Sequence, residues 1–409
     1  MTTADTDYDH HRPLVEWAPD RTHAELRARC PVAFTAHHGG YWVVTSYEQV
    51  TRCGRRDDEF TTAHDLDGTG RGRDFAGIAI PAQSMYRSLP SEIDGAEHLA
   101  YRRLLQPAFA PATSAAWAAR AREWAGGCID GCLETGQIDL VLDLANPVPA
   151  MVTLALVGLP AEEWTRYAEP LHTLVHTDPT SDARTGLLAT IGELRERLAA
   201  LVGERRARPA DDLASAVTSS EVEGRPVSDT DAVNLLFTVI SGGLDTTTAL
   251  VANALVWLDG NPDVRTRLIA DPPLRASARE EFLRVFSPAP ATARTAAQTL
   301  DVDGRTIPVG SRLLLSWTAA NRDPSVFADP DSVDVARPNN RHVAFGAGPH
   351  RCIGAPLARC TFDAIIDVVL DRIPDYAIDR TRAARYPRVG AVNGWVSIPA
   401  TFTPRNRSL

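Results

Sequence analysis

The chain has 409 residues, of which 44% are hydrophobic and 23% charged, and its formal net charge is −10. All 42 of its Lys and Arg residues are arginine, so the sequence contains no lysine. Walker-type phosphate loops, Schiff-base and pyridoxal enzymes and protein kinases all need a lysine side chain, so these classes are excluded. The acidic total also argues against nucleic acid as a partner, because phosphate binding favours net positive charge.

The six cysteines are few for this length and stand far apart, which fits a reducing compartment rather than a disulfide framework. Residues 1–20 are acidic and polar and contain no apolar core, so we expect neither a signal peptide nor a membrane anchor. These features are typical of a soluble cytoplasmic protein.

Along the chain, the pattern predicts a helix-rich protein with small β-hairpins. Residues 41–45 read as a strand, and the Ser46–Gln49 spacing predicts a capping box that opens a helix to about residue 53. Residues 62–95 form a long loop without periodicity, and such loops are often functional. Amphipathic helices follow over 97–202, then a polar connection over 205–226. Asp303-Gly304 predicts a hairpin turn.

Residues 228–259 predict a single helix that is apolar on nearly every face and about 45 Å long. Such a helix is either a membrane span or the axis of a large core. Its middle contains Gly242, Gly243 and Asp245, and a charge at bilayer depth costs about 2.5–3.5 kcal/mol. We therefore expect a buried axial helix whose polar middle has a functional purpose.

The strongest chemical signal is the segment 345–354, in which a loop with glycines and a proline delivers Cys352 just before a helix over 355–372. A cysteine near a helix N-terminus, beside His350 and Arg351, is expected to have a lowered pKa and to be a thiolate. Zinc and iron–sulfur sites need further ligands at short spacing. One thiolate in a glycine loop suits a haem iron, because the backbone must approach the porphyrin closely. The plain alternative is a buried structural cysteine.

With these residues the sequence resembles the cytochrome P450 family, the haem-thiolate monooxygenases. Its loop fits the family's haem-binding signature at five positions, and three further motifs agree in type and order. The resemblance runs from about Tyr41 to the C-terminus. The signature residues are Phe345, Gly348, His350, Cys352 and Gly354, and the other motifs are Glu281-x-x-Arg284 with Arg337, Gly243-x-Asp245-Thr246, and Asn321-Arg322-Asp323-Pro324 through Arg337-Pro338.

The resemblance implies a mainly α fold with small β-sheets, a long axial helix over the haem and a proximal cysteine loop. It implies one domain over residues 1–409, with 1–30 as a peripheral segment, and a monomer. The cofactor is expected to be haem b. The family's usual Asp-Pro-Pro before the Glu-His pair is replaced here by Asp94-Gly95-Ala96, a departure that touches no expected ligand.

By the same resemblance, Cys352 is the proximal iron ligand, and its electron donation favours O–O cleavage. Asp245 and Thr246 are the catalytic proton-relay residues, with Gly242 and Gly243 leaving room for dioxygen. Glu281, Arg284 and Arg337 form a buried structural charge network. The remaining residues expected to contact the haem, including those matching the family's propionate positions, are His98, Arg102, Arg294, His350, Phe345, Gly346 and Gly354.

The substrate pocket is expected to be lined by the long loop, the axial helix, a strand and a C-terminal turn. Its apolar character suggests a small hydrophobic molecule without strong charge. The expected lining residues are Phe75, Ile78, Ile80, Met85, Phe237, Ile240, Ser241, Gly242, Ala291, Thr292, Val392 and Asn393.

The chain carries no fused flavin or iron–sulfur domain, so a ferredoxin-type redox partner is expected to supply electrons. Arg103, Arg341, Arg351 and Arg359 form a docking patch or are scattered solvated arginines. The expected reaction uses molecular oxygen to hydroxylate or epoxidise a hydrophobic small molecule in secondary metabolism. Oxidative coupling or desaturation on the same fold, a haem sensor or carrier without turnover, and a hydrolase with Cys352 as nucleophile remain alternatives.

Overall fold

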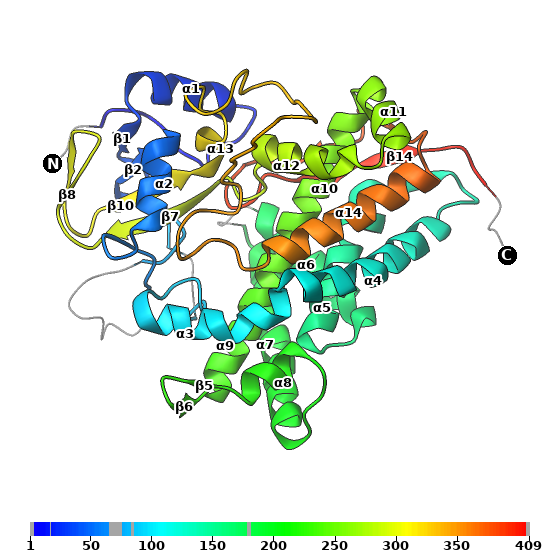
Figure 1. The fold of residues 1–409 in the computed structure, drawn as a ribbon, viewed down its shortest axis with the longest axis horizontal. Coiled ribbons are helices and arrows are strands. Elements are labelled where there is room, and N and C mark those ends of the chain that lie inside the picture. Colours follow the sequence, from blue (N-terminus) through cyan, green and yellow to red (C-terminus); the bar gives the residue numbers. More distant parts are fainter. Residues whose placement is uncertain (1–3, 17, 65–75, 83–85, 178–180, 406–409) are drawn as a thin grey trace.

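The computed structural model of the chain shows a sheet-rich part, at the left of Figure 1, beside a larger helical part. The residues that the structure describes are 4–16, 18–64, 76–82, 86–177 and 181–405.

The sheet-rich part is built on five strands in the order β1-β2-β10-β7-β3, of which the β2–β10 pair is parallel. α1, α2 and α13 pack against this sheet, and a hairpin, β8–β9, extends from it. The elements are α1 (Pro19–Arg29), β1 (Val32–Thr35), β2 (Tyr41–Val44), α2 (Tyr47–Arg55), β3 (Phe60–Thr61), β7 (Ala291–Ala296), β8 (Leu300–Val302), β9 (Arg305–Ile307), β10 (Arg312–Ser316) and α13 (Trp317–Ala320).

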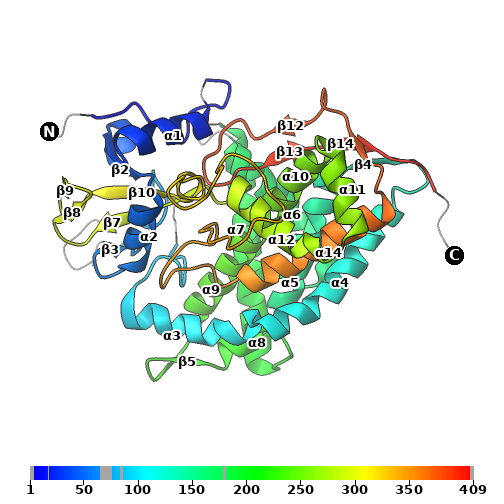
Figure 2. The ribbon, with the colours of Figure 1, turned by 45° about the horizontal axis from the view of Figure 1, so that its top comes forward.

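The helical part surrounds α9 and α10, which run through its middle, while α4 and α14 lie side by side on one flank (Figures 1 and 2). The longer helices are α3 (Gly95–Leu105), α4 (Pro111–Asp130), α5 (Pro147–Val157), α6 (Trp164–His176), α7 (Ala183–Ala207), α8 (Leu213–Thr218), α9 (Asp229–Gly243), α10 (Asp245–Asp259), α11 (Pro262–Ala270), α12 (Leu274–Phe286) and α14 (Ala355–Arg372). A π-helix (Leu140–Ala145) and short 3₁₀ turns (His37–Gly39, Gln106–Phe109, Ala161–Glu163) connect them.

Three small sheets complete the fold. They are β4 (Gln137–Asp139) with β14 (Pro399–Thr401) and β11 (Ala377–Ile378), then β12 (Ala384–Arg385) with β13 (Trp395–Ser397), and the hairpin of β5 (Glu221–Val222) and β6 (Arg225–Pro226). The fold is thus mainly α with small β-sheets, as the sequence predicted. The segment 205–226, predicted as a polar connection, contains the end of α7, the short helix α8 and the β5–β6 hairpin.

Local signals in the sequence match the structure closely at two turns. Ser46 Oγ accepts a hydrogen bond from the Gln49 amide at 3.4 Å, although Gln49 Oε1 has no partner in the described part of the chain, so only half of the capping box forms. Asp303 and Gly304 both have positive φ, at 54° and 74°, as a two-residue hairpin turn requires.

The predicted axial helix is two helices that meet at a kink. α9 ends at Gly243 and α10 starts at Asp245, with Leu244 at φ −76°, ψ −78° between them. Residues 229–259 and 140–157 are long and apolar enough to span a membrane, but 67% and 78% of these windows are buried inside the protein. Mostly buried helices of this kind also form the cores of soluble proteins, so the kinked helix is the axis of the core.

Candidate active site at the kink of the central helix

A cavity of about 330 Å³ separates the cysteine loop from the α9–α10 junction. Its walls come from the loop over 344–354, the start of α14, α3, α5 and β7. Cavities of this size, with a mainly apolar wall and a few polar groups, are where small ligands bind in proteins.

The cysteine loop forms one wall of this cavity and is fixed by its glycines. The Cys352 amide donates to the Phe345 carbonyl at 2.8 Å, which closes the loop on itself. Gly348 has φ +75°, and a Cβ there would lie 2.3 Å from the Gly54 carbonyl of α2. Glycine is therefore required both by the backbone conformation and by the close approach to α2. Gly354 caps α14, so Cys352 stands at the N-terminal end of that helix.

Cys352 is accessible only from the cavity that it lines. Protein atoms surround that cavity, so the thiol still lies deep inside the molecule. Burial raises the pKa of the Cys352 thiol above its ordinary value, while the Gly354 amide and the charge of Arg102 oppose this shift without cancelling it. The lowered pKa expected from the sequence is therefore wrong for the thiol in its protein surroundings, since that expectation left out desolvation.

Buried basic side chains face the same cavity. Arg294 is 3% exposed and His98 is 1% exposed, and both line the wall together with Arg102. Among the described residues, neither Arg102 nor Arg294 has a carboxylate within 4.0 Å, and His98 Nδ1 has no hydrogen-bond partner. Burial lowers the pKa of Arg294 to about 10 and, together with the charges of His350 and Arg102, lowers that of His98 to about 4.

His350 lies beside these side chains but has partners within the chain. Its Nε2 is 3.0 Å from Asp94 Oδ1 and 3.2 Å from Thr62 Oγ1, and its ring centroid is 4.1 Å from that of His98. Burial would raise the pKa of Asp94, but the hydrogen bonds from His350, Thr61 and Thr62 outweigh it and lower that pKa to about 2. No sequence motif predicted Thr62 at this place, whereas Asp94 begins the segment in which the chain departs from the family motif.

Across the cavity, the α9–α10 junction presents Gly242 and Thr246. The Thr246 hydroxyl donates to the Gly242 carbonyl at 2.8 Å, and the position of a Cβ at Gly242 is open space. Gly243 differs, because a Cβ there would lie 2.7 Å from Thr153 Oγ1 of α5. The room predicted at both glycines therefore exists at Gly242, whereas Gly243 allows α5 to pack closely.

Asp245, the predicted partner of Thr246, is not part of the cavity wall. It is 4% exposed, and its carboxylate accepts hydrogen bonds from His172 of α6 and Tyr386 of the C-terminal segment. These partners lie 73 and 141 residues away in the sequence. The sequence offered no local signal that would have brought them together.

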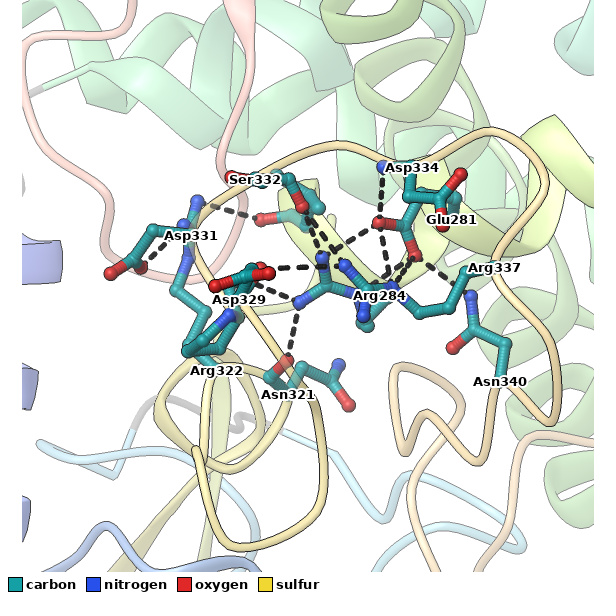
Figure 3. Close-up of polar contacts among 12 residues, drawn as sticks. Glu281, Arg284, Asn321, Arg322, Asp329, Asp331, Ser332, Asp334, Arg337 and Asn340 are labelled. Carbon is teal, nitrogen blue, oxygen red and sulfur yellow. Dashed lines mark hydrogen bonds and ion pairs between the residues drawn. The ribbon is translucent and has the colours of Figure 1, made fainter.

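The predicted network of Glu281, Arg284 and Arg337 is present in full (Figure 3). Glu281 and Arg284 form two hydrogen bonds of 2.7 and 2.8 Å, and Arg337 Nε lies 3.0 Å from both Glu281 oxygens. Asn321 links this network to the cysteine loop, because its carbonyl accepts from Arg284 and its Oδ1 accepts from the Val343 amide. The network thus holds the chain that leads into the loop.

Of the residues predicted to line the substrate pocket, Ile78, Gly242 and Thr292 are in the cavity wall. Phe75 and Met85 lie outside the described residues. The other seven are described residues that do not line the cavity. They are Ile80, Phe237, Ile240, Ser241, Ala291, Val392 and Asn393.

Each of these seven side chains is used elsewhere. Ile80 and Ala291 pack in a small core with Tyr8 and Tyr41, while Phe237 and Ile240 belong to the main core. Val392 packs on Tyr386, and Asn393 donates to the Phe286 carbonyl. Ser241 is exposed and donates to the Thr238 carbonyl. Helical periodicity could not separate the wall-facing positions from these core positions.

The residues around the cavity fit a haem group. The wall offers one thiol, the buried guanidinium of Arg294 and the half-buried guanidinium of Arg102, both without a carboxylate partner, and an unpartnered imidazole nitrogen. A ligand with a metal and two carboxylates satisfies all of them at once, because buried cations need anionic partners.

Comparison with known proteins decides the family. A cytochrome P450 family model matches residues 273–373, which contain the charge network and the cysteine loop. The putative cytochrome P450 123 of Mycobacterium tuberculosis is 30% identical, over 84% of this chain and 82% of that protein. The chain belongs to the cytochrome P450 family. It is a P450 monooxygenase that binds haem b, and the family fold is present in full.

Two further relatives place this P450 among bacterial enzymes. The vitamin D(3) 25-hydroxylase of Pseudonocardia autotrophica is 30% identical over 81% of this chain and 80% of that protein. The open structure of the P450 EryK from S. erythraea has a TM-score of 0.85 at 28% identity, covering 98% of this chain and 100% of that one. Bacterial P450s of this kind take electrons from redox partners such as ferredoxins and act on small substrates with O₂.

Proposed function

We propose that this P450 hydroxylates or epoxidises a small hydrophobic molecule as a tailoring step of secondary metabolism in the cytoplasm. One observation carries the proposal: the Cys352 thiol faces Gly242 and Thr246 across a cavity in which the Arg102 and Arg294 guanidinium groups have no carboxylate partner among the described residues. This arrangement supplies a metal ligand, anion contacts and a hydroxyl group around one space.

In this proposal Cys352 ligates the haem iron, and His98, Arg102, Arg294 and His350 hold the propionates. Phe345, Gly346 and Gly354 shape the loop under the ring, and the ligated haem supplies the oxygen-activating redox chemistry. Arg359 holds Phe345 in place, because its guanidinium lies 4.6 Å from the centre of that ring and pairs with Glu280.

The wall above the loop favours an apolar substrate. This surface is mainly apolar, and such a wall selects by shape and hydrophobicity. Its hydroxyl groups include those of Thr153, Thr238, Thr246, Thr247 and Thr292. One of the relatives reported above is a vitamin D(3) 25-hydroxylase, and vitamin D(3) is a hydrophobic molecule. The apolar wall residues are Ile78, Val152, Leu156, Val239, Leu250, Pro288 and Ala289.

For electron delivery we propose docking of an acidic ferredoxin on the cysteine side. Arg103, Arg341 and Arg351 are exposed there. Arg359 is better assigned to loop support, since Glu280 already neutralises its charge through a bidentate ion pair. Electrostatic steering by the three exposed guanidinium groups would weaken as ionic strength rises.

The reduced protein with CO provides the test of the haem-thiolate site. We expect a strongly red-shifted Soret band for the wild type and its loss in Cys352→Ser, because serine removes the thiolate ligand. Cys360→Ser is the matched control, since that cysteine lies two turns into α14. A colourless protein after haem-replete expression, or a band that survives Cys352→Ser, would contradict the proposal.

The hydroxyl role of Thr246 has a separate test. Thr246→Ala is expected to raise the share of consumed O₂ that is released as peroxide, because the hydroxyl at the cavity wall is lost. Its O–H group donates to the Gly242 carbonyl, so its oxygen is free to accept a hydrogen bond. Thr248→Ala is the control on the same helix, since this hydroxyl donates to the Ala145 and Leu244 carbonyls and does not line the cavity. Equal peroxide shares in both variants and the wild type would remove Thr246 from proton delivery.

A further inference from the structure

Asp245 is the acid of the relay proposed above, yet its carboxylate is directed away from the cavity. His172 Nδ1 lies 2.7 Å from Asp245 Oδ1, and the Tyr386 hydroxyl donates to both carboxylate oxygens at 2.9 Å. The three side chains are 4%, 4% and 2% exposed. Because Asp245 is enclosed in this way, His172 and Tyr386 determine its protonation state and its orientation.

The proton positions in this cluster follow from its contacts. Burial favours a neutral His172, but the hydrogen bond and charge of Asp245 outweigh it and raise the pKa of His172 above its ordinary value. Burial and the Asp245 charge raise the pKa of Tyr386, so its hydroxyl stays a donor. Both ring nitrogens of protonated His172 then donate, Nε2–H to the Val396 carbonyl at 3.4 Å and Nδ1–H to the Asp245 carboxylate.

The cluster joins three parts of the fold. His172 comes from α6, Asp245 from the first turn of α10, and Tyr386 from the segment after β12. Gly394 makes room for the tyrosine, because a Cβ there would lie 2.7 Å from Tyr386 Cε2.

The other titratable groups facing His172 are few. His176, one turn along α6, has its ring centroid 5.6 Å from that of His172 and 5.1 Å from that of Tyr386. Asp139 of β4 adds a favourable charge effect on His172. His176 is only half-buried, so the cluster approaches the protein surface on this side.

We propose that His172 and Tyr386 are positioning residues for Asp245, which receives protons on their side of α10 and releases them on the cavity side. The proposal rests on the monooxygenase function proposed above. In the first position, protonated His172 and Tyr386 hold the carboxylate. In the second position, the protonated acid faces Gly242 and Thr246.

The proton transfer balances without a further reactant except water. The Nδ1–H bond of His172 breaks and an O–H bond forms on Asp245, which leaves both groups neutral. Loss of the ion pair frees the acid to turn toward the cavity, where its O–H bond breaks and the proton passes to a water molecule. The carboxylate then returns, and neutral His172 takes a new proton from water on the His176 side.

The first test observes His172 itself and needs no turnover. In protein labelled with ¹³C at histidine Cε1, we expect the His172 resonance to titrate at a higher pH than in Asp245→Asn, because the variant removes the carboxylate charge. A His172 titration that is unchanged in Asp245→Asn would overturn the pairing and with it the proposal. This outcome does not depend on whether the proposed reaction occurs.

The second test measures O₂ consumption with a surrogate ferredoxin and ferredoxin reductase, without substrate. His172→Gln is expected to lower the rate about tenfold at pH 7 and to abolish the decline that the wild type shows as pH rises through the His172 pKa. Tyr386→Phe, which keeps the ring, is expected to lower the rate less. Its rate should still decline as pH rises, but at a different pH from that of the wild type. Tyr376→Phe is the control, since this buried tyrosine donates to the Leu255 carbonyl instead.

The outcomes separate this proposal from the proposed function. A wild type without the red-shifted CO band fails the proposed function, and the histidine titration still decides the pairing. A wild type with that band, together with His172→Gln and Tyr386→Phe rates that match Tyr376→Phe at every pH, would overturn the positioning role alone. Loss of the CO band in His172→Gln would indicate misfolding, and Tyr386→Phe then decides.

Discussion

Arg284 and Arg294 are both buried arginines, but they lie in opposite electrostatic surroundings. Arg284 is 0% exposed, pairs with Glu281 and donates to three backbone carbonyls (Figure 3). Arg294 is 3% exposed, and among the described residues its side chain donates to the neutral oxygens of Thr292 and Ala293. The first arginine is satisfied by the fold, and the second leaves its charge available to a ligand.

This difference separates structural charges from functional ones. A buried cation with a carboxylate partner costs most when that partner is removed, because an uncompensated charge remains. A buried cation without a partner already carries its desolvation cost: the pKa of Arg294, lowered by burial from 12.5 to about 10, corresponds to about 3 kcal/mol. Such a cost persists in a protein where a ligand offsets it.

Removing the satisfied arginine has the largest expected effect on folding. Arg284→Leu leaves the Glu281 carboxylate buried with one guanidinium fewer, so we expect a loss of about 3–5 kcal/mol in the free energy of unfolding. Urea denaturation measures it, with Arg208→Leu on the surface as the control. A loss below about 1 kcal/mol would show that the network contributes little to stability.

Replacing the cavity-wall arginine by leucine is expected to change the free energy of unfolding of the haem-free protein in the opposite direction. Arg294→Leu removes an unpartnered buried charge, so the haem-free protein should be as stable as the wild type or more stable. Haem retention should fall about 10- to 100-fold, the usual worth of charge-assisted hydrogen bonds of about 1.5–3 kcal/mol. Apomyoglobin transfer kinetics measure the retention. Equal destabilisation by Arg284→Leu and Arg294→Leu would erase the distinction.

Asp94 shows that one basic group of the cavity wall, His350, already has a carboxylate partner within the protein. Its pKa of about 2 lies below the ordinary 3.8, so its contribution of about 2 kcal/mol is present above pH 4 and is lost as pH falls toward 2. We expect Asp94→Asn to lose about this amount at pH 7 and to match the wild type near pH 2. A pH series of urea midpoints measures both values, and a constant gap across the series would contradict this assignment.

The sequence predicted the charge network and the cysteine loop, because both are encoded by short local motifs. The Glu281-x-x-Arg284 spacing and the glycines around Cys352 are local patterns with one structural solution, and the structure places them as expected. The predicted roles of these residues toward haem remain proposals.

What the sequence missed depends on contacts between distant segments. The pairing of Asp245 with His172 and Tyr386 joins three segments, and no periodicity indicates it. The kink at Leu244 was missed because helical periodicity continues through it. The sign of the Cys352 pKa shift was missed because desolvation depends on the tertiary fold, whereas the helix N-terminus and neighbouring charges can be seen in the sequence.

The smallest expected effect on stability concerns the buried pair of His172 and Asp245. The pKa of His172 is raised in the folded protein, so its contribution to stability is fully present below the unfolded value near 6.5 and is lost as pH rises through the folded value. His172→Gln should therefore be less stable than the wild type at pH 6, and this gap should narrow toward pH 9. Thermal unfolding of both proteins in the same buffers measures the gap. A gap that widens with pH would mean that His172 is held neutral, and Asp245 would then resemble the satisfied acid of the Glu281 network rather than a proton carrier.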